Sequence, residues 1–275
     1  MVTPVDAARL FGRFVRTIAS DPRIAKMLEP AARGARYANE KFVETKKPTV
    51  SEQPAQSNPL LDYFLAHEEG PGIFKFMHYF DIYHRHFSRF VGKKVRVMEV
   101  GVYSGGSLGM WRDYFGPDCT VYGVDIEPAC LSYKRDGVEI LIGDQGDPRF
   151  WKQVKESVPE IDIFIDDGSH FPEHQILTLE EMLPHVAPGG VFLCEDIYGY
   201  PAGFLPYLFG LSSAFYSATD NDFLKAVDSI HFYPSIGVIE KAARYGEHRS
   251  PMEALRRGTQ WAPFDSYARK GRGLA

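Results

Sequence analysis

Five apolar runs between residues 95 and 196 constrain the fold most, because each run leads directly into glycine or carboxylate residues. The runs are rich in β-branched and aromatic residues, which predicts strands. We place these strands at residues 95–100, 121–126, 138–142, 161–165 and 190–194. Helical segments lie between most of them, and this alternation predicts an α/β fold with a parallel sheet. Since ligands bind outside the carboxyl ends of such strands, we expect the polar residues there to surround one pocket.

Charge and cysteine usage argue against several classes of protein. With 275 residues, the chain can form one large domain, or one domain with an appendage. Its net charge of -5 argues against nucleic-acid binding, which requires clustered Lys and Arg. The three cysteines show no paired spacing, so neither a zinc ribbon nor a disulfide framework is indicated. The sequence shows no long apolar run and no signal peptide, and we expect a cytoplasmic protein without a membrane partner.

The chain on either side of the strand region differs from it in composition. Apolar residues recur near helical spacing over residues 4–30, whereas residues 44–59 are polar and rich in proline. We expect a helical appendage and linker over residues 1–60, the main domain over 61–245 and a peripheral tail over 246–275. The apolar stripe of the appendage is compatible with a homo-oligomer, a dimer or larger, which we expect. The sequence leaves open whether the linker acts as a lid.

An aromatic segment precedes the first strand. Residues 72–90 carry seven aromatic residues together with His78, His84 and His86. We expect a helix that leads into the strand, with most of the rings in the core. The histidines have no carboxylate partner nearby in sequence, so a zinc site is not indicated there.

The segment after the fifth strand predicts one more helix and two more strands. The helix is expected over residues 221–227, and the strands over 229–233 and 236–240. The Pro234-Ser235 connection between the two strands is tight, so we expect them to pair antiparallel.

A glycine loop after the first strand is the first candidate ligand site. Gly101, Gly105 and Gly106 come after Glu99 in a Gly-x-x-x-Gly-Gly pattern, which differs from the dinucleotide-binding Gly-x-Gly-x-x-Gly. Glycine lets the backbone approach a ligand closely, and the free amides of the next helix favour anionic groups. Asp125, at the end of the second strand, can accept hydrogen bonds from ribose hydroxyls.

Paired carboxylates form the second candidate site. Asp166-Asp167 and Glu195-Asp196 end adjacent predicted strands. Crowded carboxylates repel each other and raise each other's pKa, and a hard cation such as Mg²⁺ relieves that repulsion. His170 lies three residues after Asp167 and is a candidate base, with a helix cap as its structural alternative.

Two further residues carry alternatives of the same kind. His174, one helical turn after His170, is a competing base. Asp144 comes after the third strand and can reach an adenine amino group, or it can form a turn through its own side chain.

Five motifs together resemble a known family, although each alone is common. They are Glu-x-Gly-x-x-x-Gly-Gly-Ser (99–107), Gly-Val-Asp-Ile (123–126), Gly-Asp-Gln (143–145), Asp-Asp-Gly-Ser-His (166–170) and Pro-Gly-Gly…Glu-Asp (188–196). This combination resembles the class I S-adenosylmethionine-dependent methyltransferases. More narrowly, it is similar to metal-dependent sugar O-methyltransferases of the mycinamicin and demethylmacrocin type, the cephalosporin-hydroxylase-like group and actinobacterial polysaccharide O-methyltransferases. The resemblance covers roughly residues 72–241.

The resemblance implies a fold, cofactors and a reaction. The fold is a Rossmann-like sheet of seven strands, the last one antiparallel, with helices on both faces. The cofactors are S-adenosylmethionine and Mg²⁺. The residues implied to bind S-adenosylmethionine are Glu99, Gly101, Ser107, Asp125, Asp144, Gln145 and Asp166. Those implied to bind Mg²⁺ are Asp167, Glu195 and Asp196, with Asp167 and the base His170 as the catalytic residues.

The implied reaction is methylation of a sugar hydroxyl on a glycosylated natural product or an oligosaccharide. Three alternatives stay open. The acceptor could be a phenol or catechol, or the chain could be an accessory subunit that binds S-adenosylmethionine without turnover. A nicotinamide oxidoreductase is disfavoured by the glycine spacing. The sequence does not identify the acceptor sugar or the hydroxyl position.

Overall fold

A computed structural model describes residues 33–34, 37–38, 57–198, 203–216 and 222–243. The chain divides into two compact units, Met1–Gln56 and Ser57–Ala275, and the second unit contains the sheet and the candidate site. The helix predicted over residues 4–30, most of the predicted linker and the predicted tail lie outside the described residues. Within the described part of the chain, every helix is too short or too polar to cross a bilayer.

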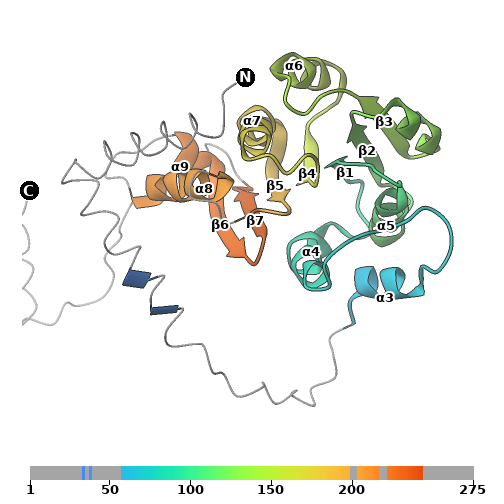
Figure 1. The fold of residues 1–275 in the computed structure, drawn as a ribbon, viewed down its shortest axis with the longest axis horizontal. Coiled ribbons are helices and arrows are strands. Elements are labelled where there is room, and N and C mark those ends of the chain that lie inside the picture. The colour runs from blue at the N-terminus through green and yellow to red at the C-terminus, as the bar shows by residue number, and fades with distance from the viewer. Residues whose placement is uncertain (1–32, 35–36, 39–56, 199–202, 217–221, 244–275) are drawn as a thin grey trace, which may run out of the picture. The chain divides into compact units, whose positions relative to one another are not determined.

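Seven strands form a single sheet in the order β3-β2-β1-β4-β5-β7-β6 (Figure 1). The strands are β1 (Arg96–Val100), β2 (Thr120–Asp125), β3 (Val138–Ile142), β4 (Ile161–Asp166), β5 (Val186–Cys194), β6 (Val227–Tyr233) and β7 (Ile236–Lys241). Strands β1 to β5 pair in parallel, whereas β7 pairs antiparallel with both β5 and β6. The prediction of seven strands with the last one antiparallel is therefore confirmed.

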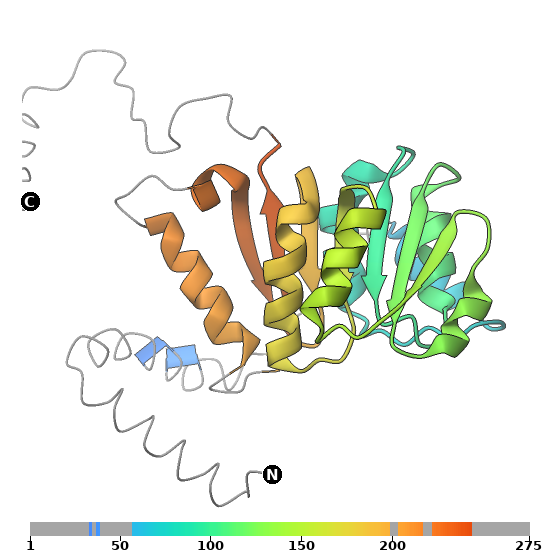
Figure 2. The same ribbon diagram turned by 90° about the horizontal axis from the view of Figure 1, so that it is seen from above.

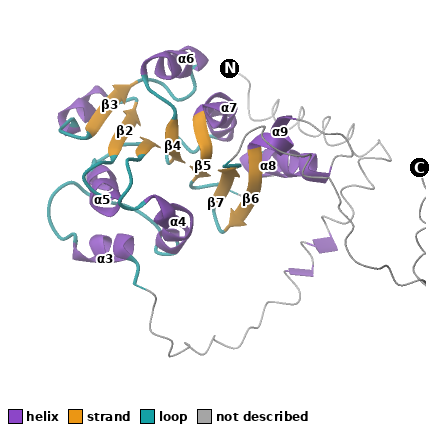
Figure 3. Ribbon diagram, turned by 180° about the vertical axis from the view of Figure 1, so that it is seen from behind, coloured by secondary structure: helices purple, strands orange, loops and turns teal. Residues whose placement is uncertain are grey.

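Helices cover both faces of this sheet (Figure 3). One face carries α3 (Pro59–Ala66), α4 (Tyr79–Phe87) and α5 (Gly106–Phe115). The other carries α6 (Pro148–Ser157), α7 (Pro172–Met182), α8 (Phe204–Ser213) and α9 (Asp222–Ala226). In Figure 2 the orange α8, the yellow α7 and the green α6 lie side by side over this second face.

Strand alternation divides the core into two layers. Successive side chains of a strand point to opposite faces, and both faces of a central parallel strand are buried. In β4, Ile163 and Ile165 pack with α4 and α5, whereas Phe164 packs with α6 and α7. Phe164 also stacks on Phe192 of β5, with ring centroids 4.9 Å apart. This two-sided burial explains why the strands are nearly continuous apolar runs in the sequence.

The aromatic segment differs from its prediction. The helix begins only at Tyr79, and residues 73–76 alternate between half-buried and exposed side chains. Phe74 is 81% exposed and Phe76 is 47% exposed, so these two rings are exceptions to the expectation that most of the rings lie in the core, which the other rings bear out. A period of two places Lys75 on the inward side, between them. The rings of α4 itself are buried, as predicted: Tyr79, Phe80, Tyr83 and Phe87.

Candidate functional site

A cavity of about 1090 Å³ lies at the carboxyl ends of the parallel strands. The loops after β1, β2, β3, β4 and β5 all contribute to its lining. The predicted site residues in the lining are Gly101, Ser107, Asp125, Asp144, Gln145, Asp167, His170, Glu195 and Asp196. The predicted pocket is therefore present, and it brings together residues from Gly101 to Asp196.

Gly101 permits the close contact of two loops at the floor of the site. Its φ is +92°, in the region that favours glycine, and a Cβ atom there would collide with the carbonyl oxygen of Asp167. The Gly101 amide donates to the carbonyl of Val124 at 2.8 Å, and the Asp167 amide donates to that of Val100 at 3.1 Å. The glycine loop and the loop after β4 are thus held together through their backbones.

Asp125 and Asp144 are held by amides of nearby loop residues. The two carboxylate oxygens of Asp125 accept hydrogen bonds from the amides of Tyr103 at 3.0 Å and Glu127 at 2.9 Å. Asp144 accepts from the amide of Gly146 at 2.8 Å, which is the turn-forming role given as its structural alternative. Both residues nevertheless line the cavity.

Gln145 and Asp166 form a buried support beneath the loop after β4. The side-chain amide of Gln145 donates to Asp166 Oδ1 at 2.7 Å and to Thr178 Oγ1 at 3.1 Å, while its oxygen accepts from the Ser169 amide at 2.9 Å. Burial raises the pKa of Asp166 to about 7. These contacts give both side chains a structural role in the loop that carries His170, and a role toward a bound cofactor stays a prediction.

Lys75 lies beside the acidic cluster, as we call the carboxylates Asp167, Glu195 and Asp196. A role for this lysine was not predicted from the sequence. Its side chain is 3% exposed, and its Nζ pairs with Asp167 Oδ2, with Glu195 Oε2 at 2.9 Å and with Glu99 Oε1 at 3.7 Å. Burial alone lowers the pKa of a lysine, but the attraction of Glu195, Asp167 and Glu99 outweighs burial and raises the pKa of Lys75. The available signal was a single charged residue between Phe74 and Phe76.

Two tyrosines of α4 orient the carboxylates at the end of β5. The hydroxyl of Tyr83 donates to Glu195 Oε1 at 2.6 Å, and that of Tyr79 donates to Asp196 Oδ1 at 2.7 Å. Burial and the neighbouring carboxylates raise the pKa of both phenols, so both stay protonated and remain donors. The aromatic segment thus supplies hydrogen bonds to the site as well as packing.

Glu99 lies near the end of β1, beneath the same cluster. It is fully buried, and its Oε2 accepts a hydrogen bond from Ser107 Oγ at 2.6 Å. Burial raises the pKa of Glu99, and the charge of Lys75 offsets part of that effect. Glu99 and Ser107 therefore join the glycine loop to the acidic cluster, and their role at the methionine end of a cofactor site stays a prediction.

His170 faces the acidic cluster in a strained backbone conformation. Its φ is 58° and that of Asp196 is 51°, values uncommon for residues other than glycine. The Nε2 atom of His170 lies 3.6 Å from Asp196 Oδ2 and 4.0 Å from Asp167 Oδ1. Its Nδ1 has no hydrogen-bond partner among the described residues. Strain at two facing residues is typical of functional sites.

The structure also shows what His170 and His174 contact in their own loop and helix. Helix α7 begins at Pro172 without a side-chain cap, so His170 does not cap it. His174 lines the cavity, but its Nδ1 pairs with Ser169 Oγ at 2.9 Å. The geometry therefore favours His170 over His174 as the group that faces the carboxylates.

The acidic cluster fits a cation. Asp167, His170 and Asp196 each present one ligand atom, and these atoms lie within 4.8 Å of one another. Glu195 is held by Lys75 and Tyr83. Asp167 and Glu195 already gather around the buried ammonium of Lys75, and oxygen donors of this kind suit Mg²⁺.

Curated relatives of the chain methylate sugars. It is 34% identical over 193 residues to 8-demethyl-8-alpha-L-rhamnosyl tetracenomycin-C 2'-O-methyltransferase of Streptomyces olivaceus, a match that covers 60% of this chain and 50% of the relative. It is 37% identical over 141 residues to mycinamicin VI 2''-O-methyltransferase of Micromonospora griseorubida, covering 48% and 35%. It is 31% identical over 211 residues to L-olivosyl-oleandolide 3-O-methyltransferase of Streptomyces antibioticus, covering 72% and 52%.

The chain also resembles solved structures of a methyltransferase. The MycE methyltransferase of the mycinamycin biosynthetic pathway, in complex with Mg and SAH, matches with a TM-score of 0.61 and 26% identity over 77% of this chain and 59% of that one. A MycE complex that also holds mycinamycin VI matches equally well. No protein-family model matches the chain. The matched segments span about a third to a half of the curated relatives' length.

Proposed function

We propose that this chain, which has the class I methyltransferase fold and sugar O-methyltransferases as relatives, transfers a methyl group from S-adenosylmethionine to a sugar hydroxyl. The acceptor is a glycosylated natural product or an oligosaccharide. One observation carries the proposal: a single cavity joins the glycine loop and Asp125 to the acidic cluster of Asp167, Glu195 and Asp196. A methyl donor and a chelated hydroxyl would there lie next to each other.

Different residues of the cavity would bind different parts of the methyl donor. The loop of Gly101 brings backbone amides close to the ligand, and Asp125 binds the ribose hydroxyls. Asp144 also lines the cavity and would contact the adenine. Much of the rate enhancement would come from holding the donor and the acceptor oxygen at a near-attack distance.

Mg²⁺ fits the acidic cluster, with Asp167, Glu195 and Asp196 as its ligands. When bound, it would lower the pKa of a chelated sugar hydroxyl. Lys75 pairs with two of these carboxylates, Glu195 and Asp167, so its ammonium would compete with a bound ion for them. The hydroxyls of Tyr83 and Tyr79 on α4 hold Glu195 and Asp196 in position.

His170 serves as the general base. Its Nε2 faces Asp167 and Asp196 and would take up the proton of the acceptor hydroxyl. Neutral imidazole is suited to this step near pH 7. The loop contacts of Gln145 and Ser169 hold the histidine at the rim of the cavity.

A turnover assay tests the proposal. The full chain is incubated with S-adenosylmethionine, Mg²⁺ and a panel of glycosides and phenols, and methylated products are detected by mass spectrometry. We expect methylated glycosides, and a loss of roughly 10²–10⁴-fold in rate for His170→Gln. His174→Gln is the matched control and should retain most of the activity.

Full turnover by His170→Gln or Asp167→Asn would contradict the mechanism. Products from phenols alone would instead favour the alternative acceptor class. Binding of S-adenosylmethionine without product on any acceptor would favour an accessory subunit. The homo-oligomeric state and the cytoplasmic location stay predictions from the sequence.

A further inference from the structure

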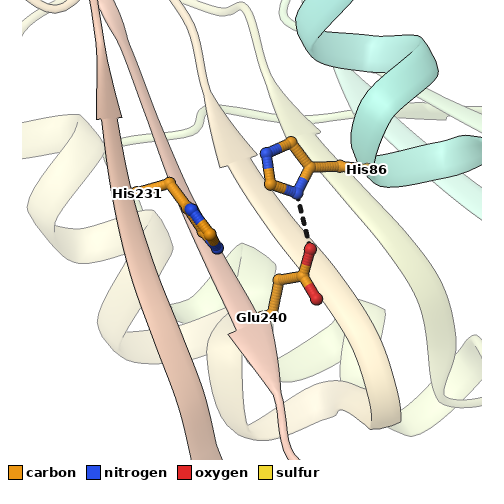
Figure 4. Close-up of side chains that lie close together, drawn as sticks. All are labelled: His86, His231 and Glu240. Atoms are coloured by element: carbon orange, nitrogen blue, oxygen red, sulfur yellow. Dashed lines mark hydrogen bonds and ion pairs between the residues drawn. The ribbon is translucent and has the colours of Figure 1, made fainter.

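A second group of metal-ligand side chains lies outside the lining of the cavity. His86 of α4, His231 of β6 and Glu240 of β7 point toward one another, as Figure 4 shows. Each offers one ligand atom, and these atoms lie within 4.8 Å of one another. The proposed methyl transfer uses none of the three. Their convergence comes from three separate elements of the fold.

The donor set is that of a transition-metal site. Two imidazoles and one carboxylate are the ligand combination that suits Zn²⁺ with a fourth position for water. His86 Nδ1 lies 2.5 Å from Glu240 Oε1, and the ring of His231 lies 4.8 Å from that of His86, centroid to centroid.

Neighbouring polar groups hold the candidate ligands in place. The hydroxyl of Tyr233 lies 2.9 Å from His86 Nε2, which leaves Nδ1 directed at Glu240. Ser229 Oγ lies 2.9 Å from His231 Nε2. Metal-binding histidines characteristically have such a partner on the second ring nitrogen, as His86 has in Tyr233.

Arg89 is the charged group that faces this cluster. Its Nη2 lies 3.2 Å from Glu240 Oε2 and its Nη1 lies 3.3 Å from Oε1. A metal ion bound through Oε1 would leave Oε2 to Arg89, so the two cations can share the carboxylate. The side chains of Arg89 and Glu240 are 40% and 21% exposed, which provides a path for an ion from solvent.

We propose that His86, His231 and Glu240 bind a divalent transition-metal ion of the Zn²⁺ type. The ion would fasten α4 to the antiparallel edge formed by β6 and β7. Because α4 also carries Tyr79 and Tyr83, this clamp would stabilise the helix that orients Asp196 and Glu195.

Titration calorimetry with Zn²⁺ on the EDTA-treated full chain tests the site. Three variants are compared with the parent: His231→Gln and Glu240→Gln, which alter half-buried ligands, and Asp196→Asn, which alters the other cluster. We expect the parent to bind Zn²⁺, both ligand variants to bind it at least about 10–100-fold more weakly at this site, and Asp196→Asn to retain it. His86 is left unchanged because it is buried in the core.

Co²⁺ provides a second readout. A His₂Glu site should give visible ligand-field absorption in the parent and in Asp196→Asn, and lose it in His231→Gln. Circular dichroism of the metal-free variants verifies that they are folded. Zn²⁺ binding that disappears only in Asp196→Asn, or that is unchanged in both ligand variants, would overturn the proposal, as would the absence of Zn²⁺ binding by the parent.

Discussion

Lys75 shows how single side chains decide the electrostatics of the site. A buried ammonium loses several kcal/mol of hydration and persists only where opposite charges compensate. Its contacts with Glu195, Asp167 and Glu99 provide that compensation. The lysine therefore neutralises two of the three carboxylates that we propose for Mg²⁺, Asp167 and Glu195, and it would compete with the ion for them.

Lys75→Met tests this competition. Removing the ammonium while keeping a similar chain length should tighten Mg²⁺ binding by roughly tenfold, which corresponds to about 1.4 kcal/mol. The metal-free variant should also be less stable than the parent, because unpaired buried carboxylates remain. Titration calorimetry with Mg²⁺ and urea unfolding with and without Mg²⁺ measure the two effects.

Lys134→Met is the matched control for that experiment, because Lys134 pairs with Glu139 on the surface. It should leave Mg²⁺ affinity unchanged. Equal or weaker Mg²⁺ binding by Lys75→Met would show that Lys75 does not compete with the ion.

Asp166 predicts a pH dependence of stability. Its pKa is raised to about 7 by burial, from an ordinary value of 3.8, so the folded protein keeps a proton that the unfolded chain releases. Stability from this group is therefore lost as pH rises toward 7. Asp166→Asn removes the effect, and the stability of the parent relative to the variant should fall by up to about 1.4 kcal/mol per pH unit between pH 5 and 7.

Urea unfolding in EDTA at pH 5, 6 and 7 measures this slope. Asp118→Asn is a control with the same chemical change at an exposed position. A constant difference between the parent and Asp166→Asn across the three pH values would contradict a raised pKa.

At the scale of elements, the site depends on contacts between loops that extend from different strands. The loop after β1 and the loop after β4 touch at Gly101 and Asp167, and a hydrogen bond from the Asp167 amide to the Val100 carbonyl reinforces this contact. Neither loop alone forms a pocket. The parallel register of β1 with β4, which pairs Val100 with Asp166, places the two loops next to each other.

Gly101→Ala tests the need for that close approach. The new Cβ would meet the Asp167 carbonyl, and the positive φ adds strain, so we expect a loss of about 1–3 kcal/mol in the free energy of unfolding. Binding of S-adenosylmethionine should weaken as the loop shifts. Urea unfolding and titration calorimetry measure the two effects.

Gly92→Ala separates the effect of the positive φ from the effect of the contact between the loops. Gly92 also has a positive φ, of 71°, but a Cβ there meets no atom within 4 Å. If Gly101→Ala cost no more than Gly92→Ala, backbone conformation rather than the loop contact would explain the glycine.

At the scale of the whole molecule, one sheet gathers residues from most of the second unit into one cavity. Ligands that bind there should stabilise the folded protein by mass action. At a hundred times its Kd, S-adenosylmethionine should add about 2.7 kcal/mol, which shifts the Tm by roughly 5–10 °C for a domain of this size. Differential scanning fluorimetry measures the shift, with NAD as the control ligand.

A shift with NAD equal to that with S-adenosylmethionine would contradict the assignment of the methyl donor. Asp125→Ala should reduce the shift with S-adenosylmethionine, because it removes the carboxylate proposed to bind the ribose. Addition of Mg²⁺ with the methyl donor should raise the Tm further.

The strands and the polar residues that end them could be predicted from the sequence, because the patterns that indicate them involve only neighbouring residues. Apolar runs buried on both faces, such as residues 161–165, carry their own pattern, and the carboxylates at their ends need no distant partner to be recognised. The positions of Asp125, Asp167 and Glu195 around one cavity are then a consequence of parallel topology. The reversal of β7 is a consequence of the short Pro234-Ser235 connection.

Local sequence patterns were enough to predict the parallel sheet, the reversed last strand and the residues that end the strands at the cavity, because strand periodicity and short turns are properties of neighbouring residues. The side chains that meet across long separations became known from the folded structure alone. It buried Lys75 among three carboxylates, and it joined His86 to Glu240, which lies 154 residues away. Such pairs depend on how helices pack against the sheet, and packing depends on the whole core rather than on any local pattern.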